Sequence, residues 1–521
     1  MGQLPRTTSF WIAVSLFAVY LINGLIAIPA NSVVYDETDH WSYGKRILQG
    51  EPQKVHTYDD ATAMPVTSIN AVPRAVEQLF NPGLSKTDGG VSDVMHGRYV
   101  TLFVCLLIGL YVYKWSKELF GEWGGLFSLF LLVFCPNVNA HVTLLSTDAY
   151  TALFALTTFY YFYQFIRKSG WKHFILFSLS FGIAQVSKYS LLHLLPVFGL
   201  LSLVLLISRR SLFSNWKRNF VRLVVFSAIV LAVINTAFFF NGSGRSLEAY
   251  SFRSATFQSL QNIPVVGRIP LPLPVAYVEG IDITYHMTEL GAGNKLAAAL
   301  NYLNGEYRTG RGFWNYYLLL ILYKTPIPYL LIFLLLGILY VRRWKNRKVV
   351  SPEFIIGFSL LYFMAFFSFF LPIQSGNRHI IFFYPLLYVL AGRLTTVNWK
   401  QKYKLATFSV LALYSLLTFY YYFPNLISYT NELVANKTNA YQVMADTNLD
   451  YGQGSYVLEK YLAHHPDVKM ATPAPQSGKV IIGLNDFVDL YNTGKYGWLK
   501  QYKPYAHLYH CYLLFDIPSE K

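Results

Sequence analysis

The chain of 521 residues is 54% hydrophobic, 17% aromatic and 13% charged, whereas an ordinary soluble domain carries roughly 25% charged residues. Its formal net charge of +16 would favour nucleic acid as a partner if the basic residues covered a soluble surface, but they cluster in short loops between apolar runs. Composition and charge placement therefore exclude an ordinary soluble protein, and no nucleic-acid partner is expected.

Apolar runs recur from Phe10 to about Phe423, and a helix of roughly 20 such residues crosses the bilayer core. The first run, Phe10 to Pro29, lacks a clear small-residue cleavage site, so we interpret it as a spanning helix and not a secretory signal. Counting the runs, with basic loops on alternate sides, predicts about eleven spanning helices. Their approximate centres are residues 19, 107, 130, 156, 179, 199, 229, 333, 362, 386 and 413.

The basic loops set the predicted orientation. By the positive-inside rule they face the cytoplasm, together with the N-terminus, and an odd number of helices places the C-terminus on the non-cytoplasmic side of the cell membrane. The outer face then carries two long loops, 31–97 and 241–313, and short turns near Ser146, Lys188 and Gln374. The basic residues concerned are Lys114, Lys117, Arg167, Lys168, Lys172, Arg209, Arg210, Lys217, Arg218, Arg342, Arg343, Lys345, Arg347, Lys348, Lys400, Lys402 and Lys404.

Hydropathy falls after residue 423. We therefore predict a transmembrane domain over residues 1–423 and a soluble, non-cytoplasmic C-terminal domain over residues 424–521. The segments Val480–Leu484, Phe487–Leu490 and His507–Phe515 are typical of short strands or helices. The expected fold is mainly α, a polytopic transmembrane helical bundle with a small α+β tail.

Acidic residues lie at two points of the predicted outer face. Asp36 and Glu37 follow the first spanning helix, and Asp148 lies at the outer end of the fourth. Each has an ordinary alternative interpretation. The pair can be the start of a solvated loop, and Asp148 can be a helix-start acid favoured by the helix dipole, with Ser146 or Thr147 as the cap.

Basic residues lie on the same predicted face, where positive charge is under-represented. Lys188 precedes Tyr189, Arg378 ends the turn Ser-Gly-Asn-Arg, and Lys324 precedes Pro326, which is expected to break a helix. Each also fits a cation that snorkels to the membrane interface.

Carboxylates and cations on one face suit transfer of a sugar from a polyprenyl phosphate. A carboxylate can take the proton of an acceptor hydroxyl, while fixed cations stabilise the leaving phosphate. No Gly-rich nucleotide loop is visible, and no cofactor is expected to be required. Asp36 and His40, at i and i+4, can share a helix face and bind a divalent metal with Asp148, but no HExxH or paired-cysteine pattern supports this alternative.

These residues resemble the protein O-mannosyltransferase and aminoarabinose transferase group of C-type glycosyltransferases, glycosyltransferase family 39, over nearly the whole chain. The resemblance rests on an ordered set of short motifs. They are Asp36-Glu37, the stretch Pro136 to Asp148, Lys188-Tyr189, Tyr302 to Glu306, Lys324-Thr325-Pro326, Gly376-Asn377-Arg378 and Asp446 to Gln453.

The resemblance implies an inverting enzyme that uses a dolichyl- or undecaprenyl-type phosphate sugar. It implies that Asp36 is the base, that Glu37 helps to position the acceptor or donor, and that Asp148 is the second acidic residue. Arg378, with Lys188 and Lys324, would meet the donor phosphate. The candidate substrate-binding residues are His40, Tyr189, Glu306, Asp446, Asp450 and Gln453.

Parts of the chain depart from this pattern. The tail does not resemble the β-trefoil domain of eukaryotic protein mannosyltransferases, and Gly280 to Lys295 matches no motif. Residues Asp446 to Gln453 can alternatively be a polar turn that ties the tail to the membrane portion. The expected partners are membrane lipids, a polyprenyl-phosphate sugar donor and a protein, lipid or glycan acceptor.

Two other classes compete with the enzyme. A transporter or lipid flippase would also be polytopic and basic, but it would place ionisable residues at mid-membrane depth along a path, whereas the candidates here fall at helix ends on one side. A noncatalytic scaffold would not require Asp36 and Asp148 to converge. The arrangement of these carboxylates therefore distinguishes the hypotheses.

Overall fold

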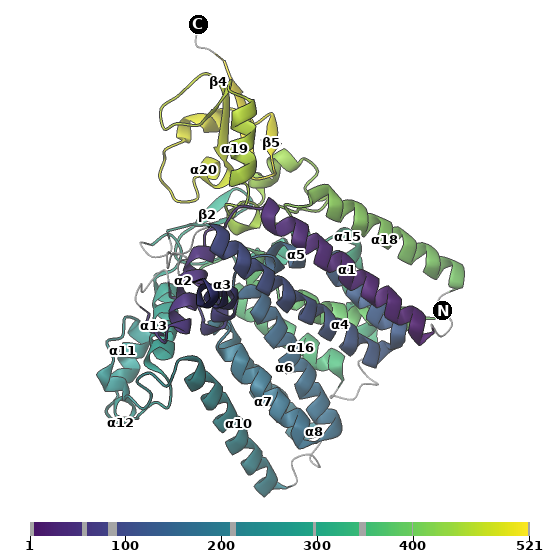
Figure 1. The fold of residues 1–521 in the computed structure, drawn as a ribbon, viewed down its shortest axis with the longest axis vertical. Coiled ribbons are helices and arrows are strands. Elements are labelled where there is room, and N and C mark those ends of the chain that lie inside the picture. The colour runs from purple at the N-terminus through teal and green to yellow at the C-terminus, as the bar shows by residue number, and fades with distance from the viewer. Residues whose placement is uncertain are drawn as a thin grey trace.

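Helices make up most of the chain in the computed structural model, and a small mixed domain follows them at the C-terminal end (Figure 1). The structure describes residues 5–54, 60–81, 91–208, 215–294, 298–342, 351–398 and 400–518. The predicted fold class is confirmed. Of the predicted basic loops, residues 209–210 and 343–348 lie outside the described residues.

Each predicted centre of a spanning helix falls inside a helix. The helix α4 accounts for two of them, because Gly121 has non-helical backbone angles (φ 81°, ψ −176°) and divides it. The helices are α1 (Arg6–Ala30), α4 (Val91–Val133), α6 (Asp148–Lys168), α7 (Trp171–Gln185), α8 (Leu194–Ser208), α10 (Trp216–Ala237), α15 (Ile327–Arg342), α16 (Pro352–Phe369), α17 (Phe383–Ala391) and α18 (Gln401–Tyr422).

Length and hydropathy identify the helices that can cross a bilayer by themselves. Among the described residues six helices qualify, and Ile327–Arg342 is a shorter apolar helix. The six are Arg6–Ala30, Asp93–Val133, Tyr189–Ser208, Trp216–Ala237, Pro352–Phe369 and Gln401–Tyr422. A multi-pass membrane protein follows from these lengths.

The two long segments that were predicted to lie on the outer face contain secondary structure that hydropathy did not predict. The first holds α2 (Glu37–Leu48), the short turn η1 (Pro65–Thr67) and α3 (Ser68–Phe80). Acids in the first turn of α2 and bases in its last turn suit the helix dipole. The second holds η3 (Leu247–Ala249), α11 (Ala255–Gln261), α12 (Pro264–Gly267), α13 (Val275–Leu290) and the hairpin of β1 (Asn301–Leu303) and β2 (Glu306–Arg308).

Turn chemistry explains two local features. Asn304 and Gly305 connect the hairpin with φ values of 50° and 79°, the left-handed conformations that an Asn-Gly hairpin turn requires. The helix break expected at Pro326 is confirmed, because α14 (Tyr316–Lys324) ends at Lys324 and α15 begins at Ile327. Pro at this point lacks the amide hydrogen that a continuous helix needs.

The C-terminal region is an α+β unit, as predicted. Its four-stranded sheet has the order β3-β4-β6-β5, with β3 parallel to β4 and the other pairs antiparallel. Figure 1 shows this unit at one end of the bundle, beside the end at which α1 meets α2. Its elements are η7 (Lys437–Gln442), η8 (Asp446–Asn448), α19 (Ser455–His464), β3 (Val468–Met470), β4 (Gly478–Gly483), α20 (Leu484–Val488), η9 (Gly497–Gln501), β5 (Ala506–Leu508) and β6 (Tyr512–Ile517).

Candidate active site

Two carboxylate–cation pairs form where helices end near the C-terminal unit. Asp36, the residue before α2, pairs with Arg378 in the short turn η5 (Asn377–Ile380). Asp148, the first residue of α6, accepts a hydrogen bond of 2.6 Å from Nζ of Lys188, which precedes the turn η2 (Tyr189–His193). Four predicted residues from distant parts of the sequence are thus brought together in two pairs.

His40 shows that the two pairs belong to one centre. Burial lowers the pKa of His40 to about 4, while Asp36 and Asp148 act to raise it and Arg378 and Lys188 act to lower it. All four charges therefore lie close to this imidazole, which is neutral at physiological pH. This arrangement favours the enzyme hypothesis, which required Asp36 and Asp148 to converge, over a noncatalytic scaffold.

Asp36 is ionised in this structure. Burial raises the pKa of its carboxyl, but the charge and hydrogen bond of Arg378 outweigh this effect and hold the pKa at about 2. The side chain of Asp36 remains 35% exposed, against 15% for Arg378. Asp36 is therefore a charged carboxylate that an incoming group can reach.

Residues 446–451 pack against Arg378 and the residues that precede it. The guanidinium donates to the Tyr451 hydroxyl and lies 4.9 Å from the centre of its ring. Burial raises the pKa of Asp446, an effect that a hydrogen bond from Ser375 and the charge of Arg378 partly offset. A β-carbon on Gly376 would collide with Thr447, and Gly376 has φ 79°. Only glycine permits this close approach.

Glu37 lies beneath the centre and is fully buried. Its carboxylate forms an ion pair of 2.5 Å with Arg98 and accepts backbone N–H groups from Val34 and Leu145, each at 2.8 Å. Arg98 also donates to carbonyls of Ile28, Asn31 and Ser32 at the end of α1. The resemblance gave Glu37 a part in positioning the acceptor or donor, but both of its oxygens are occupied. Its contacts hold the loop after α1 against the loop before α6.

Lys324 was predicted to meet the donor phosphate, but its ammonium group is bonded to backbone carbonyls in this structure. It is 2% exposed, and Nζ donates to the carbonyl oxygens of Ile427 (2.8 Å), Tyr429 (3.1 Å) and Asn448 (2.5 Å). An ammonium group has three hydrogens, so none is left for a ligand. Lys324 instead ties α14 to the segment that follows α18.

Gln453 and Glu306, two of the candidate substrate-binding residues, lie in different environments. Gln453 is fully buried, and its side chain bonds to Asn425, Ser428 and Leu449 within the tail. Its carbonyl accepts the Ser32 amide at 3.0 Å, which joins the tail to the loop after α1. Glu306 is exposed on β2, and no ion pair or hydrogen bond joins its side chain to the described residues of the centre.

Asp450 and Tyr189 are both buried, but in different parts of the molecule. Asp450 is 6% exposed and accepts the Gly452 amide at 3.0 Å, and burial raises its pKa to about 6. Tyr189 is buried against α13, where its hydroxyl lies 3.4 Å from the carbonyl of Tyr277. Tyr189 also lines the cavity beside Lys188.

An apolar cavity of about 600 Å³ opens beside Lys188. Lys188, His379 and Thr62 contribute polar groups to its wall, whereas Phe366, Phe367, Phe370 and Leu371 are apolar. The remaining wall includes α13 residues Ile281, Thr284, Tyr285 and Thr288. The segment that matched no motif therefore has a place in the architecture, as a wall of this cavity.

Metal-binding side chains do not form a cluster in the described residues, where no group of three His, Cys, Asp or Glu can hold an ion. Asp36 and Asp148, which the metal hypothesis joined to His40, each face a cation instead. Nδ1 of His40 and of His141 is buried without a hydrogen-bond partner.

Arg98, Tyr451 and His379 were not among the predicted site residues. The signal for Arg98 was present, because an arginine at the predicted outer end of a spanning helix breaks the positive-inside rule as Lys188 does. His379 follows Arg378 directly but has no distinctive local pattern. The role of Tyr451 depends on a contact between residues 73 positions apart, which local sequence does not encode.

Solved structures of membrane glycosyltransferases share this fold. ArnT from Cupriavidus metallidurans, bound to undecaprenyl phosphate, aligns over 98% of this chain and 100% of its own with 12% identity and a TM-score of 0.50. The oligosaccharyltransferase from Archaeoglobus fulgidus in its apo form aligns over 86% of this chain and 59% of its own, also with 12% identity and a TM-score of 0.50. The chain therefore has the fold of the C-type membrane glycosyltransferases.

A family model narrows the class. Residues 92–235 match the dolichyl-phosphate-mannose-protein mannosyltransferase family, a stretch that includes Asp148 and Lys188. No relative among the curated proteins matches. The resemblance to glycosyltransferase family 39 is confirmed, and it supports a glycosyltransferase-type enzyme.

Proposed function

We propose that the protein transfers a sugar from a polyprenyl-phosphate donor to an acceptor hydroxyl on the non-cytoplasmic face, with inversion at the sugar carbon. One observation carries the proposal. Two ion pairs, Asp36–Arg378 and Asp148–Lys188, converge on His40, and Lys188 also lines an apolar cavity.

The cavity suits the donor lipid. Lys188 and His379 would face the phosphate, while the phenylalanines at positions 366, 367 and 370 would surround the first isoprene units. ArnT, which shares the fold, was solved with undecaprenyl phosphate, and we extend that ligand class to this chain. A lipid donor explains why an apolar wall adjoins charged groups.

The transfer step follows from the charges. The acceptor hydroxyl would give its proton to the Asp36 carboxylate while its oxygen forms a bond to the anomeric carbon. The bond between that carbon and the phosphate oxygen breaks, and polyprenyl phosphate leaves with the electron pair. Arg378 and Lys188 would stabilise the negative charge on the leaving phosphate. Attack opposite the leaving group inverts the configuration.

Donor binding would also change the basicity of Asp36. With a pKa of about 2, Asp36 is a weak base while Arg378 is bonded to it. A phosphate that draws the Arg378 guanidinium toward itself would remove this stabilisation, so the pKa of Asp36 would rise toward its usual range. The carboxylate would thus become a better base only when the donor is in place.

The acceptor would approach from the side of the C-terminal unit. Asp446 lies near Asp36 and Arg378, and Asp450 belongs to the same segment, so both are placed to hydrogen-bond an acceptor or sugar. The active site and C-terminus would be non-cytoplasmic and the N-terminus cytoplasmic. Labelling of single cysteines introduced at Thr7 and Lys469 with an impermeant thiol reagent in intact cells tests this orientation.

Turnover tests the function directly. Purified protein in lipid is incubated with a panel of radiolabelled polyprenyl-phosphate sugars, and release of the sugar is measured for the wild type, for Asp36→Asn and for the control Asp467→Asn. Asp467 is 57% exposed in the tail. We expect turnover with at least one donor, loss of turnover in Asp36→Asn and no loss in the control. A folded wild type that is inactive with every donor, or an active Asp36→Asn variant, would refute the proposal.

A further inference from the structure

Arg222 is a buried cation in the second turn of α10. It is 8% exposed, and Nη2 donates to the carbonyl of Ser169 at 3.0 Å. Its guanidinium carbon lies 4.9 Å from the ring centre of Phe165, 5.9 Å from that of Trp171 and 6.0 Å from that of Phe174. Aromatic faces attract a cation but do not neutralise its charge.

Arg222 has no counter-ion in the part of the chain that the structure describes. No carboxylate forms an ion pair with it, and its buried Nε has no hydrogen-bond partner. Residues 209–214, which precede α10 in the sequence, include no Asp or Glu. The carboxylate of Glu118 does not pair with Arg222; it accepts hydrogen bonds from Tyr160 and Gln164. A buried, unpaired charge is costly, and proteins normally satisfy it with an opposite charge.

A second cavity of about 390 Å³ adjoins this guanidinium. It lies between α6, α7, α8 and α10, and Arg222 is its charged lining residue. Aromatic rings dominate the rest of its wall, notably Phe177, Phe198 and Phe226. The wall follows α7 from Phe174 to Phe181, a length of about 10 Å at 1.5 Å per residue. An apolar space about 10 Å long with one cation at its wall suits an anion that carries a hydrocarbon chain.

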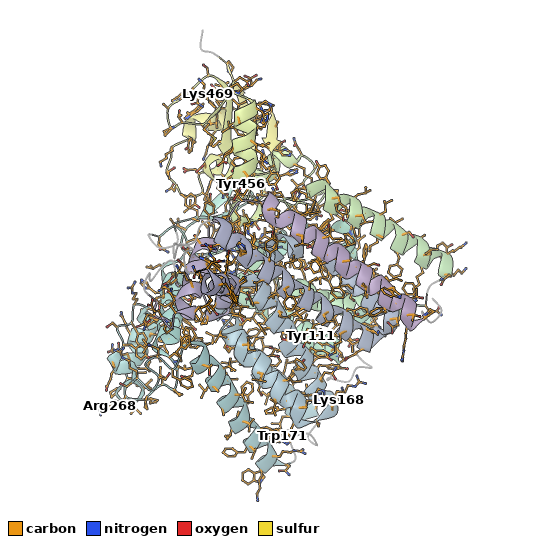
Figure 2. The ribbon with its side chains drawn as sticks, viewed as in Figure 1. Tyr111, Lys168, Trp171, Arg268, Tyr456 and Lys469 are labelled. Carbon is orange, nitrogen blue, oxygen red and sulfur yellow. The ribbon has the colours of Figure 1, made fainter. Side chains whose placement is uncertain are left out.

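This cavity lies far from the candidate active site. Asp148 begins α6, whereas Phe165, Ile166 and Ser169 of the cavity lie at the other end of that 21-residue helix, about 30 Å away. Figure 2 shows Lys168 and Trp171 at one end of the bundle and Tyr456, in α19 of the C-terminal unit, beyond the other end. Leu195, in the first turn of α8, lines both this cavity and the proposed donor cavity, but Arg222 lies at the end remote from Lys188.

We propose that this cavity binds an anionic phospholipid from the leaflet opposite the active site. The phosphate would accept a hydrogen bond from Nε of Arg222, while an acyl chain occupies the space between the phenylalanines. Arg222 lies six residues into α10, about 9 Å from its start, a depth that a lipid headgroup reaches. Basic pockets between spanning helices bind anionic headgroups in this way.

Lipid titration tests the site. Delipidated protein in neutral detergent is titrated with phosphatidylglycerol and with phosphatidylcholine, and bound lipid is counted by native mass spectrometry. Arg222→Gln removes the buried charge, whereas Arg218→Gln removes a charge on the same helix without the buried environment. Gly199→Leu adds a side chain to the cavity wall at a position where an added β-carbon meets nothing within 4 Å. Leucine also favours the helix, so this variant addresses the site even if Arg222→Gln fails to fold.

We expect phosphatidylglycerol to bind the wild type at least about tenfold more tightly than phosphatidylcholine, as for a charge-assisted contact. Arg222→Gln and Gly199→Leu should each weaken phosphatidylglycerol binding about tenfold, and Arg218→Gln less than threefold. Equal effects of the two arginine changes would indicate diffuse surface charge and overturn the proposal. Equal binding of both lipids, or displacement of phosphatidylglycerol by millimolar inorganic phosphate, would do the same.

Discussion

Asp450 provides a quantitative test, because its buried carboxyl is destabilised when charged. The side chain is 6% exposed, and a β-carbon on Gly483 would lie 3.6 Å from its Oδ2 and 3.5 Å from Oδ2 of Asp486. Burial raises the pKa of Asp450 from 3.8 to about 6, with Asp486 acting in the same direction. At 1.36 kcal/mol per pKa unit, this rise corresponds to about 3 kcal/mol.

The sign follows from proton binding. Between about pH 4 and pH 6 the folded protein holds a proton on Asp450 that the unfolded chain has lost, so stability falls as the pH rises through this window. Asp450→Asn keeps an acceptor for the Gly452 amide but carries no charge. We therefore expect it to stabilise the C-terminal unit by about 3 kcal/mol at pH 8 and by less than about 1 kcal/mol at pH 4.5.

Hydrogen exchange measures this difference locally. A gain of 3 kcal/mol slows exchange of the β4 and β6 amides about a hundredfold if they exchange by unfolding of the unit. The rates are compared at pH 8 and pH 4.5 after correction for intrinsic exchange, with Asp467→Asn as an exposed control that should leave them unchanged. An equal gain in protection from Asp450→Asn at the two pH values would refute the reasoning. Faster exchange in the variant than in the wild type at pH 8 would do the same.

Three further predictions follow from the site. Glu37→Gln leaves Arg98 buried without its counter-ion, so we expect a loss of about 3–5 kcal/mol, measured as a lower thermal midpoint; an unchanged midpoint would show that the pair is unimportant. Lys324→Met removes three hydrogen bonds to carbonyls, so we expect lower thermal stability but an unchanged KM for the donor, whereas Lys188→Met should raise that KM at least about tenfold; the reverse pattern in steady-state kinetics would return Lys324 to the phosphate site. Extensive dialysis against EDTA should leave turnover unchanged; a loss that Mg²⁺ or Mn²⁺ restores would establish a metal requirement.

The bundle was predictable because a spanning helix needs about 20 apolar residues, a signal that local sequence carries by itself. The helices α2, α3 and α13 were not predicted, because they are shorter and carry more polar residues, so a hydropathy criterion assigns them to loops. Their faces are selected by packing against distant segments, which no local pattern records.

Charge placement revealed much of the site. Asp36, Asp148, Lys188 and Arg378 were identifiable because ions at the outer ends of spanning helices are unusual. Glu37 and Lys324 carried the same signal but have different roles. Their roles are set by Arg98 and by carbonyls of residues 427, 429 and 448, partners that only the folded chain brings near.

The contacts of Glu37 also constrain what the centre can accept. One carboxylate holds the amide of Val34, two residues before Asp36, and the amide of Leu145, three residues before Asp148. These contacts hold Asp36 and Asp148 at a fixed separation. If the proposed function holds, a bulkier acceptor would have to be accommodated by residues 446–451 and the C-terminal unit, so redesign of acceptor choice would begin there and not in the membrane helices.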